Sequence, residues 1–278
     1  MRHETGSLRT ADGLSLFTEA WTPEAPKATV LATVLILHGY AEHSGRYAHV
    51  AGYLAGRGFA VHSFDYRGHG KSEGARAYLE RFDLLVQDAL GVIDSVADAA
   101  PHGLVLLGHS TGGAVALHCA LRRHDLRALV LSSPYLRNAV PVSPATEAVA
   151  RFLSRMAPRL PVIRLNSKDI SRDPEVVRAY RADTLVYNKR VRARVAAELS
   201  GAGSSLEARL AELSLPLLVM CGSEDKIAAL AGSRLLYDKA GGGDKTFTVY
   251  DGHYHELFND YGKEGVLEDM ASWLEARV

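Results

Sequence analysis

The sequence predicts an α/β protein with a mainly parallel central sheet of about eight strands flanked by helices. A length of 278 residues and a hydrophobic content of 47% fit one large globular domain. Short apolar runs rich in β-branched residues recur along the chain, and stretches with helical periodicity lie between them. Because parallel strands need crossover connections, this alternation indicates right-handed β–α–β units.

The expected elements follow one another in a regular order. A hairpin opens the chain, with strands at 7–11 and 14–21 joined through Asp12-Gly13. The other expected strands are 33–37, 60–64, 104–107, 128–132, 217–221 and 246–250, and the expected core helices are 47–57, 81–99, 113–123, 231–240 and 262–277. Ligands of such sheets bind at the carboxyl ends of the strands, so reactive residues are sought in the loops that follow them.

The alternation of strands and helices breaks between about Leu136 and Gly203. Helical segments without a clear strand occupy 145–156, 174–181 and 191–199, and a glycine- and serine-rich run at 201–205 closes the stretch. We therefore expect an α/β core in two parts, residues 1–135 and 206–278, with a helical cap inserted at 136–205.

Charge and hydropathy limit the classes of partner. The formal net charge is zero, which argues against nucleic-acid binding. The first residues lack the apolar core of a signal peptide, and no apolar run approaches the roughly 18 residues that span a bilayer. A cytoplasmic protein is expected. The predicted cap is nevertheless basic, because residues 137–200 hold 13 Lys or Arg against 6 Asp or Glu, a net charge of +7.

The most informative stretch is the apolar run 104–107, which leads into Gly108-His-Ser-Thr-Gly112. A G-x-S-x-G pattern between a buried strand and a helix is typical of a nucleophile elbow. The serine of an elbow lies on a sharp turn where its neighbours must be small, and the next helix directs its N-terminal amides at the same point. Ser110 is the predicted nucleophile; the alternative is a glycine-rich turn with an incidental serine.

A serine hydroxyl needs a base to activate it, and that base needs an orienting acid. After an elbow of this kind, the acid and then the histidine are expected in chain order. Asp225 follows the strand 217–221 and His255 follows the next strand, so both lie on the serine's side of the sheet. Glu224 and His253 are the alternatives for the acid and the base.

Acyl transfer also needs donors for the developing oxyanion, which are usually backbone amides. The residue after the nucleophile supplies one of them, here Thr111. The loop after the strand 33–37 is expected to supply the other from the amide of Tyr40, because Gly39 lets this backbone approach the substrate closely.

Several longer blocks extend these patterns. They are His38–Tyr47, Phe64–Gly74, Gly108–Gly113, Gly222–Asp225 and Gly252–Glu256. Together they resemble the monoacylglycerol lipase / lysophospholipase group of α/β-hydrolases. The resemblance implies the α/β-hydrolase fold with a cap and ester hydrolysis through an acyl-enzyme. It also aligns the acid with Asp225 and the base with His255.

The resemblance further implies substrate-binding residues. In this group, the glutamate and the arginine of the first block lie near the leaving alcohol, and they correspond to Glu42 and Arg46. The alternative from the residues alone is a salt bridge that braces the oxyanion loop. Animal members carry a glycerol-binding histidine three residues beyond the catalytic one; Phe258 occupies that substrate-binding position here, so polar recognition of glycerol by its side chain is not expected.

The first cap helix has an apolar stripe beside a basic ridge. The stripe is formed by Val149, Phe152, Leu153, Met156 and Leu160, and the ridge by Arg151, Arg155 and Arg159. We expect Phe152 and Met156 to line an acyl-chain tunnel. Contact of the basic cap with an anionic membrane is a second interpretation of this helix. The alternative is an ordinary amphipathic helix that covers the sheet.

These observations favour a serine carboxylic-ester hydrolase acting on a lipid-like monoester, either a monoacylglycerol or a lysophospholipid. No cofactor is expected, and no grouping of His, Cys, Asp and Glu has the spacing of a metal site. One alternative is a proline iminopeptidase-type amidase, in which Glu42 would bind the free amine. The other is a non-catalytic ligand receptor on the same scaffold. No oligomeric state is predicted.

Overall fold

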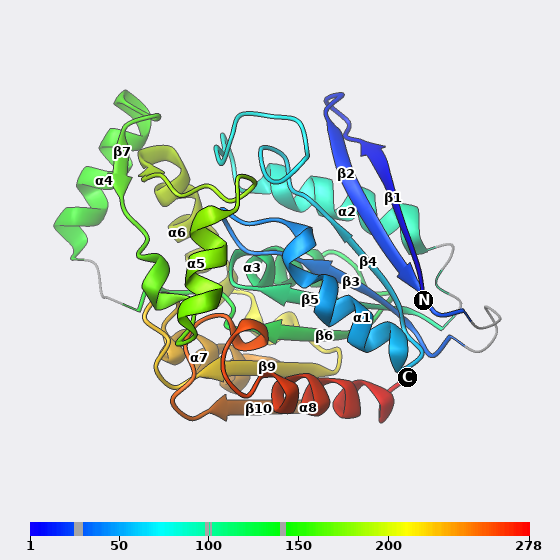
Figure 1. Ribbon diagram of the computed structural model, residues 1–278. Coiled ribbons are helices and arrows are strands. Elements are labelled where there is room, and N and C mark those ends of the chain that lie inside the picture. The colour runs from blue at the N-terminus through cyan, green and yellow to red at the C-terminus, as the bar shows by residue number, and fades with distance from the viewer. Residues whose placement is uncertain (25–29, 98–99, 101, 140–142) are drawn as a thin grey trace.

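A computed structural model describes residues 1–24, 30–97, 100, 102–139 and 143–278. Its main sheet contains β1 (Arg2–Arg9), β2 (Ser15–Thr22), β3 (Thr33–Leu37), β4 (Ala60–Phe64), β5 (Leu104–His109), β6 (Leu126–Ser132), β9 (Leu217–Gly222) and β10 (Lys245–Tyr250). The spatial order is β1-β2-β4-β3-β5-β6-β9-β10 (Figure 1). The pairs β1–β2 and β2–β4 are antiparallel and the other neighbours are parallel, so the predicted mainly parallel sheet is confirmed.

Helices cover both faces of this sheet. One face carries α1 (Ala48–Gly56) and α8 (Lys263–Glu275), and the other carries α2 (Asp83–Ala97), α3 (Thr111–Ala120) and α7 (Leu230–Lys239). The central strands are therefore apolar on both sides. In β3, for example, Leu35 and Leu37 pack toward α2 and α3, whereas Val34 and Ile36 pack toward α1 and α8. Within the described chain, no helix combines the length and apolarity needed to cross a bilayer.

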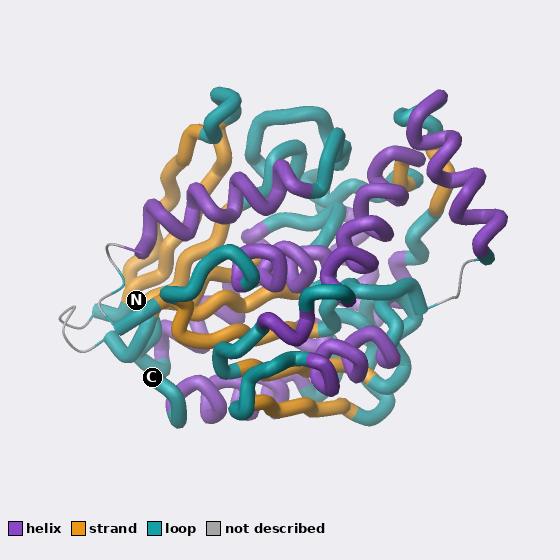
Figure 2. Tube along the Cα trace, turned by 180° about the vertical axis from the view of Figure 1, so that it is seen from behind, coloured by secondary structure: helices purple, strands orange, loops and turns teal. Residues whose placement is uncertain are grey.

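The cap lies beyond the carboxyl ends of the parallel strands. It consists of α4 (Pro144–Met156), β7 (Pro161–Ile163), α5 (Pro174–Ala182), β8 (Val191–Arg192) and α6 (Ala193–Glu207). Figures 1 and 2 show α4 at the outer edge of the molecule, beside α6. Short 3-10 helices lie at Ser44–Tyr47, Ser167–Asp169, Leu210–Glu212 and Leu257–Asn259.

Two features of the cap differ from the sequence prediction. The strands β7 and β8 form a small antiparallel sheet that the sequence did not predict, because both are very short. The predicted break at 201–205 is wrong, since α6 runs through it. A Cβ on Gly203 would lie 2.1 Å from the carbonyl oxygen of Leu136, so this glycine permits close packing rather than ending the helix. The predicted cap boundary at 205 lies inside α6, and the division into domains stays a prediction.

Candidate active site

Ser110 lies on a strained turn between β5 and α3. Its backbone has φ 51° and ψ −118°, a conformation that side-chain-bearing residues rarely adopt. The turn brings backbones into close contact: a Cβ on Gly108 would lie 2.6 Å from the carbonyl oxygen of Gly112, and one on Gly112 would lie 2.0 Å from that of Leu37. The small residues on both sides of Ser110 are therefore required by the packing, in the strand–turn–helix geometry that the sequence predicts.

The loops after β9 and β10 bring Asp225 and His255 together. The His255 Nδ1 atom lies 2.7 Å from Asp225 Oδ2, and the two side chains are 5% and 2% exposed. The other carboxylate oxygen, Oδ1, accepts hydrogen bonds from the backbone N–H groups of Ile227 and Ala228. The carboxylate is thus fixed on both sides, and Nε2 of His255 is left to exchange protons.

Burial and charge shift the pKa values of His255 and Asp225 in opposite directions. Burial disfavours the charged imidazolium, but the Asp225 carboxylate outweighs it and raises the pKa of His255 above the usual value for histidine. Burial likewise acts to raise the pKa of Asp225, yet His255 and the backbone donors lower it. The neighbouring His109 ring lies 4.8 Å from the His255 ring, and its pKa falls to about 4 because it is buried and close to His255. His255 is therefore the one of these two histidines that gains a proton readily.

The alternatives for the acid and the base lie elsewhere. Glu224 is exposed, and its backbone N–H donates to the carbonyl of His253. The Nδ1 atom of His253 contacts the carbonyl oxygen of Asp251, 3.1 Å away, and its ring packs against Tyr250. The structure thus pairs Asp225 with His255 and brings neither alternative into this contact.

The loop after β3 approaches Ser110. A Cβ on Gly39 would lie 2.8 Å from Glu42 Oε1 and 3.3 Å from His109 Cδ2, so these side chains leave little room for any residue but glycine. The Gly39 N–H donates to Glu42 Oε1 at 2.6 Å. In contrast, the N–H groups of Tyr40 and Thr111 have no acceptor among the described residues. Two free backbone donors are therefore present in the segments that flank the serine.

Glu42 and Arg46 form a buried network rather than an open binding surface. Besides Gly39, Glu42 Oε1 accepts from the Tyr47 hydroxyl (2.7 Å), and Glu42 Oε2 accepts from Arg46 (2.5 Å). Arg46 also forms two hydrogen bonds of 2.7 Å with the Glu256 carboxylate. Burial acts to raise the pKa of Glu42, but the Arg46 charge outweighs it and holds this pKa well below its usual range. The predicted bracing ion pair is present, and contact of these residues with substrate stays a prediction.

Glu256 was not predicted from the sequence, although it follows His255 directly. It links the His255 loop to the loop after β3 through Arg46. A buried arginine needs carboxylates around its planar guanidinium. The acidic residue directly after His255 was therefore the sequence feature from which this ion pair could have been predicted.

The remaining predicted substrate-binding residues lie apart from this network. Phe258 is 2% exposed and packs in the core between α1 and α8, while its carbonyl oxygen accepts from His49. Phe152 and Met156 are 62% and 67% exposed on α4. A tunnel wall would be buried, so the structure shows no tunnel at these two side chains, and their contact with substrate stays a prediction.

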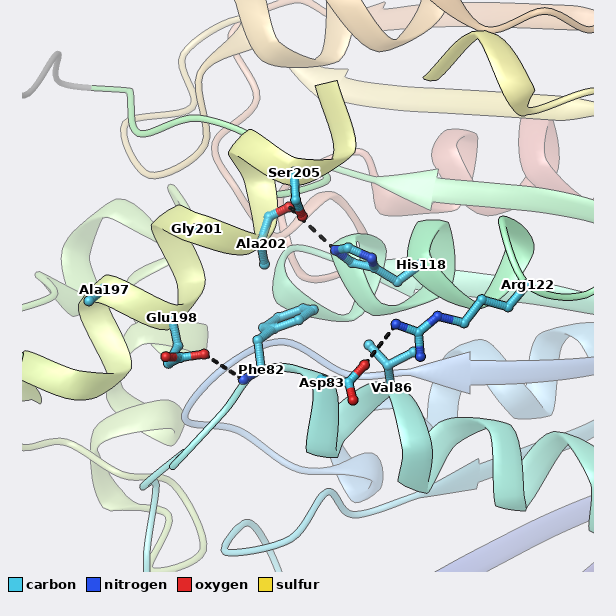
Figure 3. A pocket seen from close by; sticks show the side chains of 10 residues that line it. All are labelled: Phe82, Asp83, Val86, His118, Arg122, Ala197, Glu198, Gly201, Ala202 and Ser205. Atoms are coloured by element: carbon cyan, nitrogen blue, oxygen red, sulfur yellow. Dashed lines mark hydrogen bonds and ion pairs between the residues drawn. The ribbon is translucent and has the colours of Figure 1, made fainter. Parts of the chain in front are cut away.

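A cavity of about 300 Å³ lies between α2, α3 and α6 (Figure 3). Its polar groups are paired with one another: Glu198 with the Phe82 amide, Arg122 with Asp83, and His118 with the Ala202 carbonyl. Its lining includes neither Ser110 nor the Asp225–His255 pair. It therefore carries no feature of the candidate active site. Within the described ranges, no group of His, Cys, Asp and Glu is arranged to hold a metal ion.

The comparison with known families identifies the family to which this chain belongs. A family model described as "Serine aminopeptidase, S33" matches residues 28–262, which include Ser110, Asp225 and His255. The chain belongs to this family of serine hydrolases. The match runs from just before β3 to just before α8.

Several proteins with similar sequences are named as monoacylglycerol or monoglyceride lipases. The chain is 40% identical to the monoacylglycerol lipase of Mycolicibacterium smegmatis over 268 residues, which are 96% of this chain and 95% of that protein. It is 35% identical to the human monoglyceride lipase, covering 98% and 90% of the two chains. The crystal structure of the Paleococcus ferrophilus monoacylglycerol lipase matches with a TM-score of 0.82 at 28% identity and covers all of both chains. The predicted α/β-hydrolase fold and family are confirmed.

Proposed function

We propose that this protein hydrolyses monoacylglycerols through an acyl-enzyme formed on Ser110. His255 is the general base and acid, Asp225 orients and stabilises its imidazolium, and the amides of Tyr40 and Thr111 bind the oxyanion. The observation that carries the proposal is the buried Asp225–His255 hydrogen bond of 2.7 Å at the same sheet edge as the strained Ser110 turn.

The proposed reaction has two similar halves. His255 takes the Ser110 proton as the serine oxygen bonds to the ester carbonyl carbon, and the carbonyl oxygen becomes an anion held by the two amides. This intermediate then expels the glycerol oxygen, which takes the proton from His255. Water, activated by His255, attacks the acyl-enzyme in the same way and releases the fatty acid and Ser110.

Two observations support a monoester as substrate rather than a prolyl amide. The most similar relatives named above are monoacylglycerol lipases. An aminopeptidase would need a free carboxylate for the substrate amine, and Glu42 was the candidate. Both Glu42 oxygens are already occupied, by Arg46 on one side and by Gly39 and Tyr47 on the other.

The cap surface supports a further part of the proposal, contact with an anionic membrane. We define the apolar cap surface as the exposed side chains Val149, Phe152, Met156, Leu160, Ile163 and Leu165. Arg151, Arg155, Arg159 and Arg164 lie in the same segment and are exposed. An exposed apolar surface flanked by cations is typical of proteins that rest on anionic lipid. In the proposed orientation, α4 and β7 lie against the headgroups and the acyl chain enters from the membrane side.

Turnover of a substrate panel tests the proposed chemistry. Monoacylglycerols of graded chain length, lysophosphatidylcholine, p-nitrophenyl esters and a prolyl amide are compared in wild type and Ser110→Ala. We expect monoacylglycerols to be the best substrates and Ser110→Ala to lose about a million-fold in kcat. Retention of activity in Ser110→Ala would remove the mechanism, and faster turnover of the prolyl amide would identify an aminopeptidase instead.

A further inference from the structure

Part of the cap is bound directly to the loop that carries the Tyr40 amide. The Tyr187 N–H donates to the carbonyl oxygen of Ala41 at 2.8 Å. Next to it, His43 Nε2 lies 2.8 Å from Asp183 Oδ2 at the end of α5. On the same side, the Arg46 guanidinium lies 4.8 Å from the centre of the Tyr180 ring. Cap residues thus contact this loop at successive positions along its length.

Ala41, which accepts the hydrogen bond from Tyr187, has a strained backbone conformation. Ala41 has φ +71°, in the left-handed region that a residue with a Cβ adopts at an energetic cost. Such a conformation persists only where its surroundings hold it. Glu42 fixes Gly39 on one side of Tyr40, while Tyr187 and the Asp183–His43 pair hold the backbone on the other. The orientation of the Tyr40 amide therefore depends on both attachments.

The same cap segment is also attached to the His255 loop. The Glu256 N–H donates to the carbonyl oxygen of Ile170 at 2.8 Å. The fully buried Asp260 carboxylate accepts from Arg172 Nε at 3.0 Å and from the Tyr254 N–H at 2.9 Å. Residues 170–187 consequently bridge the two loops, one at each end. α4 differs from this segment, because it packs chiefly on α6 and exposes its apolar face.

We infer that the cap segment 170–187 positions the oxyanion-binding loop, and that Asp183 is a positioning residue that acts through His43. This inference rests on the proposed function, in which the Tyr40 amide binds the oxyanion. Without the Asp183–His43 contact, Ala41 relaxes from its left-handed conformation and the Tyr40 N–H turns away from the reacting carbonyl. Substrate binding in the ground state does not depend on that donor, so kcat falls and KM changes little.

Asp183→Ala tests this role, with Asp183→Asn as the conservative variant. Removal of an oxyanion donor lowers kcat roughly 100- to 1000-fold, and displacement of the donor lowers it less. We therefore expect Asp183→Ala to lower kcat about ten-fold. Asn keeps one oxygen to accept from the Leu185 N–H and places its amide NH2 beside His43 Nε2, which can accept in its other tautomer, so this variant is expected to recover part of the loss in kcat. Turnover is measured with p-nitrophenyl butyrate, which makes the result independent of the choice of natural substrate.

Asp173→Ala is the matched control for damage to α5. Asp173 caps the other end of the same helix by accepting from the Glu175 N–H, and within the described residues its side chain forms no hydrogen bond or ion pair with the segment 39–43. We expect this variant to weaken α5 without the loss in kcat. An equal loss in both variants would overturn the inference, because it would trace the effect to the helix rather than to His43.

Two further measurements separate this inference from the proposed chemistry. Hydrogen exchange in peptides covering residues 39–47 is expected to accelerate in Asp183→Ala and to stay slow in Asp173→Ala, whether or not an ester is turned over. In an Ala41→Gly background, the loss caused by Asp183→Ala is expected to shrink, because glycine adopts positive φ readily. Unchanged exchange, or an unchanged loss in that background, would overturn the positioning role. Activity in Ser110→Ala would instead overturn the proposed function.

Discussion

The α-carbon of Gly112 packs against the carbonyl oxygen of Leu37, so closely that a Cβ would lie 2.0 Å from that oxygen. This contact ties the start of α3 to the end of β3. Because Ser110 and Thr111 precede Gly112, and Gly39 and Tyr40 follow Leu37, it also sets the spacing between the two segments that the proposed mechanism uses.

Gly112→Ala is therefore expected to harm both stability and turnover. Overpacking of a backbone contact costs about 1–3 kcal/mol or more in unfolding free energy, and the forced separation also displaces the two amides. Denaturant unfolding and kcat measure the two effects. Gly91→Ala on the exposed side of α2 is the control, because its Cβ meets nothing within 4 Å. That change is expected to stabilise the protein by about 0.5–1 kcal/mol, and equal damage in both variants would contradict the prediction.

The pH profile of kcat/KM is expected to follow His255. Its pKa is raised above 6.5 by Asp225, and the imidazole must be neutral to accept the Ser110 proton. Activity is therefore lost as the pH falls through this raised pKa. In Asp225→Asn, the compensating charge is gone and burial dominates, so the acidic limb moves to lower pH. The plateau value of kcat/KM is expected to drop by about 10⁴-fold, because Asn no longer holds the imidazole in the tautomer that the proposed mechanism needs. A limb that stays in place in Asp225→Asn would contradict this assignment of the base.

Arg46→Met is expected to leave the carboxylates of Glu42 and Glu256 buried without their shared cation. Breaking a buried ion pair in this way lowers the free energy of unfolding by about 3–5 kcal/mol. The Arg46 charge that lowers the pKa of Glu42 is then absent, and burial raises that pKa above its unfolded value. The folded state of this variant binds more protons, so its stability increases as the pH falls.

The measurement for Arg46→Met is urea unfolding at several pH values. Arg57→Met is the control, since Arg57 also bridges two carboxylates, Glu268 and Glu275, but at the surface. Arg57→Met is expected to lose much less unfolding free energy, and its stability is not expected to increase as the pH falls. Adding Glu42→Gln to Arg46→Met is expected to recover part of the stability, and failure to do so would contradict the electrostatic explanation.

Binding to vesicles is expected to depend on the apolar cap surface. Phe152→Ser combined with Met156→Ser removes two side chains that would enter the headgroup region, and a loss of roughly ten-fold or more in partitioning is expected. Co-sedimentation with phosphatidylglycerol vesicles measures it. Val249→Ser, an exposed apolar position on β10, is the control. Binding that ignores both the double substitution and the salt concentration would remove the membrane proposal.

The positions of most strands along the chain and the nucleophile elbow could be predicted from the sequence because they depend on short-range patterns. Buried central strands are apolar on both faces, and the elbow needs small residues at fixed offsets, which are readable in Gly108 and Gly112. The continuation of α6 through residues 201–205 could not be predicted from the sequence. Gly203 signals a break locally, and only its contact with Leu136 explains why the helix continues.

The pairing within the site was only partly predictable. A sequence places acid and base in the correct loops, but loop conformation decides between Asp225 and Glu224, and between His255 and His253. Phe258 illustrates the opposite difficulty: its position in the resemblance indicated substrate contact, whereas the structure uses its side chain to fill the core between α1 and α8. The role of Glu256 depends on a partner 210 residues away, Arg46, and no local pattern encodes it.

In the proposed orientation on a membrane, the division of the cap into two parts separates access from chemistry. None of the hydrogen bonds that join the cap to the Tyr40 and His255 loops comes from residues 143–165; they come from the segment 170–187. A replacement of α4 and β7 by the corresponding piece of a relative would therefore exchange the proposed entrance while the loops that carry Tyr40 and His255 keep their anchors. Such a protein lends itself to redesign of its chain-length preference by modular grafting, with no retuning of the machinery beneath.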